Sequence, residues 1–371
     1  MDERDMLLIP GPVTVSDEVL AVHGRPIRPH YGTDWVEVYR AVTGALAQVF
    51  RTRGTVFLLF GPGMAGIEAA LRSTLAPGDQ VLIPASGSFA GRMAEVARAA
   101  GLEVRSLETS PRRPADVAAV EEALDTHPEI RALGIVHHET MLGLVNPVAE
   151  LCRAASERGV LTIVDAVSSL GGIDLRVDEW GIDVCVGVAN KCLGGPIGVA
   201  PIAVSERAWA AIDDGRPKGA GWYLDLATWR RFDEEWGSWH PHPTTMPTSV
   251  VEALGAAAER ILAEGLDAYQ AHHAEAAHRV RRGLEELGFE LLVPDDVASP
   301  VTTAALPKPG MDVDHYTDWL RREYRLRIAP GIGDLAGKIF RVGHMGRASE
   351  PDVVTAYLAA TAAYLEEAHL S

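Results

Sequence analysis

Short apolar runs alternate with amphipathic segments between residues 55 and 205, and this alternation constrains the fold more than any other feature of the sequence. Helical patterns such as AGRMAEVARAAG and PVAELCRAASERG separate several of the runs. Buried strands that alternate with helices predict an α/β fold in which helices cover both faces of a mostly parallel sheet. Ligands of such sheets bind at the carboxyl ends of the strands. The runs are VFLLF (56–60), QVLIPA (80–85), ALGIVHHET (132–140), LTIVDA (161–166), VCVGV (184–188) and GVAPIAV (198–204).

The last third of the chain has a different pattern. Two long helical patterns cover residues 248–264 and 266–287, and shorter elements follow them. The chain is therefore predicted to form a large domain over residues 1–264 and a smaller α+β domain over residues 265–371. The shorter elements are expected to be strands at FELLV, PVTTAAL, LRIAP and KIFRVG, a helix near 312–324, and a last helix capped by Ser349 with Asp352 three residues later.

Charge and cysteine content exclude several classes of partner. The net charge is −17, and protonation of all 13 histidines would leave the chain acidic. Nucleic acids and anionic membrane surfaces select a basic face, so we expect neither as a partner. Three cysteines without C-x-x-C spacing predict no disulfide framework and no zinc site. No apolar run is long enough to span a bilayer, and MDERDMLLIPG does not resemble a secretory signal. A cytoplasmic location is expected.

Only four lysines are available for chemistry that needs a primary amine. Lys218, Lys308 and Lys338 are predicted to be solvated residues of loops or strand edges. Lys191 follows the apolar run VCVGVAN and precedes the turn CLGGPIG. Burial at the mouth of a strand would lower its pKa and make the amine a nucleophile. The sequence context alone makes Lys191 the best Schiff-base candidate among the four.

Asp165 ends the apolar run LTIVDA. A carboxylate in this place is costly unless it meets a cation, a helix N-terminus or a metal. A protonated pyridinium nitrogen is one such cation. The 26 positions from Asp165 to Lys191 leave room for one helix and one strand, so both side chains could meet at one edge of the sheet.

The segment FGPGMAGIEAAL places glycines between a strand and a helix, where backbone N–H groups suit a phosphate. It is not a P-loop, because no GK[ST] follows. The glycines at 61, 63 and 66 do fit G-x-G-x-x-G, so a nicotinamide cofactor stays open as an alternative. The next strand, QVLIPASGS, lacks the acidic residue that this fingerprint requires.

The histidines do not predict a metal site. His137 and His138 are neighbours on a predicted strand, so their side chains point to opposite faces. His240 and His242 could share a face, but no carboxylate or cysteine lies near them in the sequence to complete a ligand set.

Taken together, these segments resemble the class V pyridoxal-phosphate-dependent aminotransferases of fold type I. The resemblance covers nearly the whole chain, and VDAVSSLGG followed by ANKCLGGPIG is its most specific part. The most similar activities are those of the alanine– or serine–glyoxylate, 2-aminoethylphosphonate–pyruvate and pyridoxamine–pyruvate transaminases. The other motifs that carry it are GPGMAGIEAAL, SGSFAGRM, HHETMLGLVNP and FRVGHMG.

The resemblance implies a role for each matching residue. Lys191 would form a Schiff base with pyridoxal phosphate and then move the substrate's proton, while Asp165 would hold the pyridinium proton. Arg341 would bind the substrate carboxylate. The remaining positions implied to bind the cofactor are Phe89 and Val167 on the two ring faces, Thr140 near the phenolic oxygen, Asn190 beside the lysine, the backbone of Gly63, Met64 and Ala65 around the phosphate, and Thr245 and His242 from the neighbouring subunit of a homodimer.

Some positions depart from the family pattern. Pro62 replaces a polar residue, and Met141 and Leu142 replace small hydroxyl residues. The stretch APGIGDLAGK lacks the extra arginine of the pyridoxamine–pyruvate enzymes, so that activity ranks lower. No cysteine follows Cys192, which argues against a cysteine desulfurase.

The expected activity is therefore transfer of an amino group, by a ping-pong mechanism, from a small amino acid or amine to a small 2-oxo acid such as glyoxylate or pyruvate. A pyridoxal-phosphate lyase on the same fold remains an alternative. A non-catalytic cofactor-binding protein is disfavoured because Asp165, Lys191 and Arg341 are all present.

Overall fold

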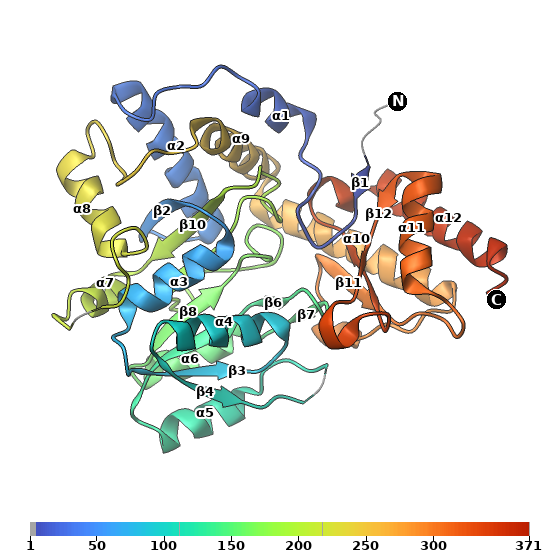
Figure 1. The fold of residues 1–371 in the computed structure, drawn as a ribbon, viewed down its shortest axis with the longest axis horizontal. Coiled ribbons are helices and arrows are strands. Elements are labelled where there is room, and N and C mark those ends of the chain that lie inside the picture. The colour runs from blue at the N-terminus through green and yellow to red at the C-terminus, as the bar shows by residue number, and fades with distance from the viewer. Residues whose placement is uncertain (1–4, 111, 217, 371) are drawn as a thin grey trace.

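The computed structural model describes residues 5–110, 112–216 and 218–370, and its largest element is a seven-stranded sheet (Figure 1). The strand order is β2-β10-β9-β8-β5-β3-β4. Only β10 runs antiparallel to its neighbours, and the other pairings are parallel. The strands are β2 (Thr55–Phe60), β3 (Gln80–Pro84), β4 (Glu103–Leu107), β5 (Ile130–Val136), β8 (Leu161–Asp165), β9 (Val184–Val186) and β10 (Val199–Val204).

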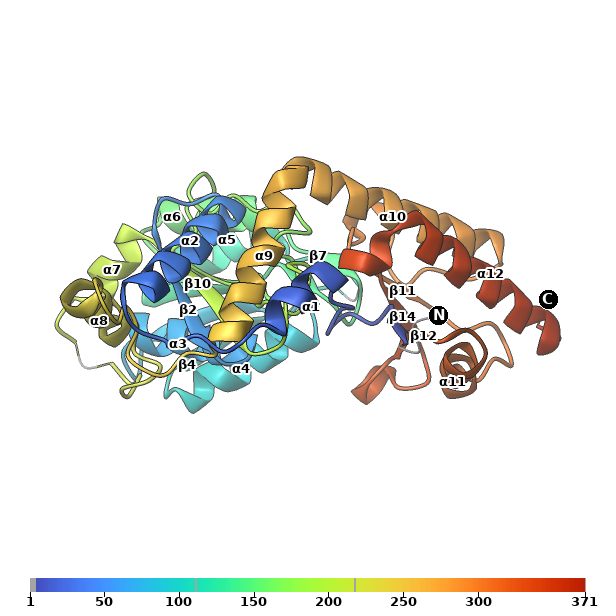
Figure 2. The ribbon, with the colours of Figure 1, turned by 90° about the horizontal axis from the view of Figure 1, so that it is seen from above.

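Helices cover both faces of this sheet, as the sequence predicts (Figure 2). Helices α3 (Gly63–Thr74) and α4 (Ser88–Ala99) lie on one face, and α2 (Thr33–Phe50) and α6 (Val148–Glu157) lie on the other. A short hairpin of β6 (His138–Glu139) and β7 (Leu144–Val145) follows β5 at the carboxyl edge. Further helices at the periphery are α5 (Val117–Thr126), α7 (Glu206–Ile212) and α8 (Leu226–Trp236).

Residues 266–370 form a second layered unit with its own hydrophobic core, and the helix before them packs on α2 of the large unit. Helices α9 (Thr248–Glu264) and α10 (Leu266–Glu286) match the two predicted long helices. A three-stranded antiparallel sheet follows, in the order β11-β14-β13, and packs against α10 and α11, while α12 packs on these two helices. Its elements are β11 (Thr302–Ala305), α11 (Val313–Tyr324), β12 (Leu326–Arg327), β13 (Ala329–Pro330), β14 (Phe340–Gly343) and α12 (Pro351–Glu367).

Three sequence predictions in this part need correction. FELLV does not form a strand; only Leu291 makes an isolated bridge, to Ala305, because this segment leaves α10 in an irregular loop. Ser349 does not cap α12, since its hydroxyl donates to the Gly346 carbonyl at 2.7 Å and Glu350 occupies the cap position. Asp352 instead forms an ion pair with Arg347 at 2.7 Å.

The N-terminal segment joins the two units. Strand β1 (Met6–Leu7) pairs with β12, and Leu8 is buried in the second hydrophobic core, although the sequence division placed this segment with the large domain. Helix α1 (Asp17–His23) then packs on α9 at the other side (Figure 1). Residues 8–13, which we call the N-terminal crossing, therefore run from the small unit to the large one.

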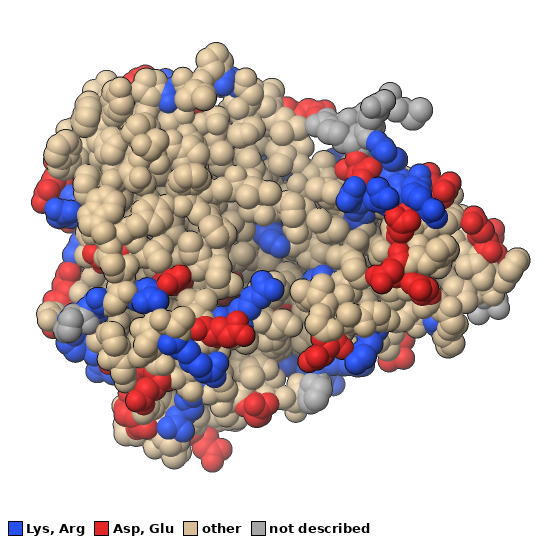
Figure 3. Space-filling model, in the orientation of Figure 1, with Lys and Arg blue, Asp and Glu red and all other residues tan. Residues whose placement is uncertain are grey.

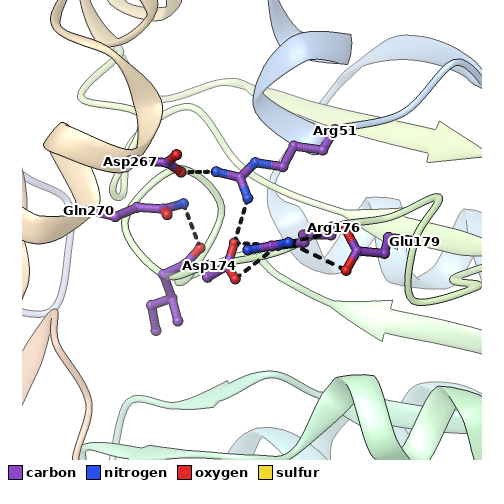
Figure 4. A network of polar contacts seen from close by, with 7 residues as sticks. Arg51, Asp174, Arg176, Glu179, Asp267 and Gln270 are labelled. Carbon is purple, nitrogen blue, oxygen red and sulfur yellow. Dashed lines mark hydrogen bonds and ion pairs between the residues drawn. The ribbon is translucent and has the colours of Figure 1, made fainter.

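A polar network fixes the start of α10 to the large unit (Figure 4). Arg51, at the end of α2, forms ion pairs with Asp174 and with Asp267 in the first turn of α10. Gln270 donates to the carbonyl of Ile173 at 3.2 Å. The first turn of α10 is thus tied to the loop after β8, which carries residues of the candidate site. None of the described helices has the length and apolar character that a bilayer crossing requires.

Candidate active site

A pocket of about 440 Å³ lies where the two units meet, and four of the predicted site residues line it. These are Phe89, Thr140, Lys191 and Arg341, which come from α4, the β6–β7 turn, the loop after β9 and β14. Figure 3 shows the hollow between the two units, with basic side-chain atoms at its base. The pocket therefore lies at the carboxyl edge of the parallel strands, where ligands of such sheets bind.

Lys191 extends its amine into this pocket and donates a hydrogen bond to the carbonyl of Pro10. Burial lowers the pKa of the amine to about 8, and the positive charge of Arg341 acts in the same direction. The negative charge of Asp165 opposes the shift. The prediction of a desolvated lysine at the mouth of a strand is confirmed. Lys218, by contrast, is not solvated: its side chain is 10% exposed and pairs with Asp214 at 2.9 Å.

Asp165 is the last residue of β8, and its carboxylate is buried. One oxygen accepts the backbone N–H of Val167 at 2.9 Å, and burial raises the pKa of the carboxyl to about 6. Within the described residues it forms no ion pair. A buried carboxylate without a counter-ion, beside the pocket that holds Lys191, fits the pyridinium N–H of pyridoxal phosphate.

Helix α3 begins close to Asp165, in contact with Val167. Gly63 is its first residue, and a Cβ placed there would lie 2.4 Å from Cγ2 of Val167. The glycine therefore lets the helix start approach the segment after β8. The first N–H groups of a helix have no intrahelical acceptor, so the start of α3, with Met64 and Ala65, can bind a phosphate.

Phe89 lies in the first turn of α4 and is half-buried. This turn is capped by Glu139, a residue that the sequence analysis did not select. The Glu139 carboxylate accepts the backbone N–H groups of Phe89 at 3.1 Å and Ala90 at 2.8 Å. Burial raises its pKa to about 7, and the two N–H groups oppose this shift. A Cβ on Gly87 would lie 2.6 Å from the Glu139 carboxyl carbon, so glycine is required beside the cap.

Arg341 lies on β14, and only 8% of the residue is exposed. Its guanidinium donates to the carbonyl of Pro330 through Nη2 at 2.9 Å and Nε at 3.3 Å. No carboxylate of the described residues pairs with it, and burial lowers its pKa. A buried guanidinium that faces the pocket and pairs with no carboxylate of the described residues is suited to bind a substrate carboxylate.

Three other predicted residues, His242, Thr245 and Asn190, do not line the pocket. Both ring nitrogens of His242 are engaged within the chain, by the indole N–H of Trp35 at 2.8 Å and the carbonyl of Thr244 at 2.7 Å. Neither nitrogen is left to reach a phosphate, so His242 holds the loop before Thr245 instead. Thr245 itself is exposed. The half-buried Asn190 accepts the backbone N–H of Val13 through its carbonyl at 3.3 Å.

His137 and His138 are both buried, and burial lowers their pKa values to about 4 and about 3. They are therefore neutral, and Nδ1 of His138 lies 3.3 Å from the Ser168 carbonyl. In the part of the chain that the structure describes, no group of three or more potential ligands could hold a metal ion.

Comparison with known proteins places this chain in a family. The family described as aminotransferase class-V matches residues 28–348. An uncharacterized aminotransferase of Methanocaldococcus jannaschii is 35% identical, over 95% of this chain and 90% of its own length. The pyridoxamine–pyruvate transaminase of Mesorhizobium japonicum is 32% identical, over 95% and 89%.

A solved structure of the ureidoglycine–glyoxylate aminotransferase of Bacillus subtilis superimposes with a TM-score of 0.94 at 30% identity. The superposition covers 99% of this chain and 94% of the other. These matches confirm the fold type I architecture. The chain belongs to the class V family of pyridoxal-phosphate-dependent aminotransferases.

Proposed function

We propose that this transaminase binds pyridoxal phosphate in the pocket and moves an amino group from a small amino acid or amine to pyruvate or glyoxylate. The observation that carries the proposal is the shared pocket of Lys191 and Arg341, one a buried amine with a lowered pKa and the other a buried guanidinium. The two half-reactions would use the same site in turn, which is a ping-pong mechanism.

Pyridoxal phosphate, when bound, supplies an electron sink for the substrate's Cα. Lys191 holds the cofactor and then takes and returns the proton at Cα, for which a pKa near the working pH is best. Asp165 keeps the ring nitrogen protonated. Phe89 and Val167 would bind the two faces of the ring, Thr140 would contribute its hydroxyl to the cofactor site, and Asn190 would support the site from beside the lysine. The start of α3 binds the phosphate.

Arg341 would orient the substrate. A guanidinium offers two parallel N–H donors to a carboxylate, which fixes the plane of the carboxylate as well as its place. Amino acid donors and 2-oxo acids both carry this group, so one arginine serves both half-reactions when the donor is an amino acid. The relatives named above act with pyruvate and with glyoxylate, and this supports a small 2-oxo acid as acceptor.

The active species is proposed to be a homodimer in which Thr245 reaches the phosphate site of the neighbouring subunit. Figure 3 shows a broad face with few charged side chains over α2 and α8, which is unusual for a monomer. An exposed apolar face of this kind is suited to bind a second copy. Beside α8, the exposed ring of Trp239 contacts the exposed rings of Tyr31 and Trp236. The other large exposed apolar side chains of the described residues include Ile27, Phe60, Ile197 and Trp222.

The three cysteines are buried thiols without disulfide bonds. Free thiols persist in a reducing compartment, and this supports the proposal that the enzyme works in the cytoplasm.

The test begins with reduction of the cofactor-loaded protein by borohydride, followed by peptide mapping. We expect the adduct on Lys191, and an adduct on Lys218, Lys308 or Lys338 would contradict the assignment. Lys191→Ala should still bind the cofactor but fail to turn over.

A screen then pairs alanine, serine, aspartate, 2-aminoethylphosphonate and pyridoxamine with pyruvate or glyoxylate, and the new amino acid is measured. Turnover with pyridoxamine as the only effective donor would identify a pyridoxamine–pyruvate transaminase, the alternative that the sequence ranks lower. Release of ammonia or another fragment without an acceptor would identify a lyase.

A further inference from the structure

The N-terminal crossing passes directly over the site and is fixed at both ends. On one side, the backbone N–H of Gly343 donates to the carbonyl of Leu8 at 2.7 Å. On the other side, the backbone N–H of Val13 donates to the backbone carbonyl of Asn190, the residue before the lysine. The crossing is thus joined both to β14, which carries Arg341, and to the loop that carries Lys191. Ile9, Pro10 and Gly11 line the pocket.

The contact between the crossing and the lysine is close. The amine of Lys191 donates to the Pro10 carbonyl, and Gly11 lies against the lysine side chain. A Cβ on Gly11 would lie 2.3 Å from Cδ and 2.6 Å from Nζ of Lys191. Gly11 also has a φ of +95°, which L-residues rarely adopt. Two independent constraints, one from the backbone and one from the lysine, therefore require glycine at this position.

We propose that the Pro10 carbonyl holds the amine of Lys191 whenever that amine is not attached to the cofactor, and that Gly11 is the positioning residue that leaves room for it. The inference rests on the proposed function for its role in turnover, but the contact itself does not depend on it. Each half-reaction needs the free amine near the substrate's Cα, so a fixed acceptor would keep the amine in reach between its two tasks.

A backbone carbonyl is chemically suited to this task. It accepts one N–H of a neutral amine and leaves the nitrogen lone pair available to take a proton. It carries no net charge, so it does not hold the amine in the protonated state as a neighbouring carboxylate would. The charged groups near the amine are Asp165 and Arg341, and neither forms an ion pair with it within the described residues.

The two constraints on Gly11 can be separated with a matched control. Gly78 has nearly the same backbone angle, with a φ of +88°, but a Cβ there would have nothing within 4 Å. Gly78→Ala therefore introduces the backbone strain alone, whereas Gly11→Ala introduces the strain and the collision with Lys191.

The first experiment measures denaturant unfolding of the cofactor-free protein for Gly11→Ala and Gly78→Ala, each with Lys191 and with Lys191→Ala. With Lys191 present, we expect the unfolding equilibrium constant of Gly11→Ala to exceed that of Gly78→Ala at least tenfold. With Lys191→Ala, the ratio should fall below threefold, because the collision is gone. If Gly11→Ala folds only beside Lys191→Ala, the inference is supported. An equal ratio in both backgrounds, or failure to fold in both, would overturn it.

The second experiment measures steady-state kinetics of the full-length, cofactor-loaded enzyme with the best donor and acceptor of the screen. A displaced amine should lower kcat at least tenfold for Gly11→Ala and leave KM within threefold, since Arg341 still binds the substrate. Gly78→Ala should leave both constants unchanged. A loss confined to KM would overturn the positioning role. A wild-type enzyme without transaminase activity would contradict the proposed function, and the unfolding experiment would still test the contact.

Discussion

The Glu139 carboxylate accepts the backbone N–H of Ala90 at 2.8 Å and so caps α4 from a different element, the hairpin that follows β5. This carboxylate ties the first turn of α4, which carries Phe89, to the segment that carries Thr140. The two sides of the pocket are therefore held in register by a residue that does not line the pocket itself.

Loss of this cap should destabilise the protein. Glu139→Ala leaves two backbone N–H groups without their acceptor, and we expect a loss of about 1–3 kcal/mol in the free energy of unfolding. Glu95→Ala, on the exposed side of the same helix, is the control and should change this value by less than about 0.5 kcal/mol. Urea denaturation of both variants makes the comparison, and equal values would argue against a capping role.

Asp165 should cost stability in the cofactor-free protein. Burial raises the pKa of the folded carboxyl to about 6, against an ordinary value of 3.8. Between pH 3.8 and about 6, the folded protein keeps a proton on Asp165 that the unfolded chain has released. The free energy of unfolding therefore falls as the pH rises through this range, and the loss persists at higher pH. Asp165→Asn should therefore stabilise the cofactor-free protein at pH 8 by about 2–3 kcal/mol and have little effect near pH 4. Denaturation at both pH values tests this, and a destabilised variant at pH 8 would contradict it.

The same substitution should disable the enzyme. Without the carboxylate, the ring nitrogen loses the charge that keeps it protonated, and the rate should fall by roughly two orders of magnitude or more. The measurement is kcat with saturating cofactor, with cofactor binding checked by absorbance. Near-normal turnover in Asp165→Asn would show that another group holds the ring nitrogen.

Arg341 should matter for both half-reactions. Arg341→Ala removes the paired N–H donors that bind the carboxylate and should reduce kcat/KM by the equivalent of about 2–5 kcal/mol. The kcat/KM of Arg341→Lys should lie between those of the wild type and Arg341→Ala. Arg347→Ala is the control, because Arg347 pairs with Asp352 and does not line the pocket. The assay measures the two half-reactions separately, one with the amino donor and one with the 2-oxo acid acceptor. Losses within about threefold in both would place the carboxylate site elsewhere.

The apolar face should govern assembly. Trp239→Glu, on that face, should convert the dimer to monomer and lower activity, because a charge buried in an interface lacks a partner. Tyr324→Glu, a similarly exposed aromatic on α11, should leave the dimer intact. Light scattering measures the molar mass of each variant in solution, and activity is measured at the same protein concentration. A fully active wild-type monomer would rule out the shared site.

The sequence predicts the central strands well because their residues are buried on both faces, so their apolar runs are continuous. Strand β4 is missed since Glu103–Leu107 forms the sheet edge and carries polar residues. Helix α8 is missed because its aromatic residues differ in burial: Trp229 is fully buried, whereas Trp236 is 49% exposed, and this obscures the usual amphipathic pattern. Both elements lie at the periphery of the large unit and bury few of their residues, so they leave a weak signal in the sequence.

The site shows the same division between local and distant signals. Lys191 and Asp165 are recognisable because each follows a buried strand, and local sequence shows this. Pro10 lies 181 positions from Lys191, and a backbone carbonyl has no sequence signal. Glu139 has no role in the sequence predictions, although a glutamate after a buried strand needs hydrogen-bond donors as much as Asp165 does.

Strand β10, the one antiparallel strand of the seven-stranded sheet in the described chain, has a consequence for how the protein is made. Phe60 in β2 pairs with Val199 in β10, and β2 has no other neighbour in the sheet. During synthesis, the apolar strand TVFLLF therefore waits for residues 61–198 to emerge, on the order of ten seconds at ribosomal rates. An unpaired apolar strand is prone to aggregate over that time. Slowing translation before residue 199 should reduce the soluble yield, and a holdase chaperone should restore it.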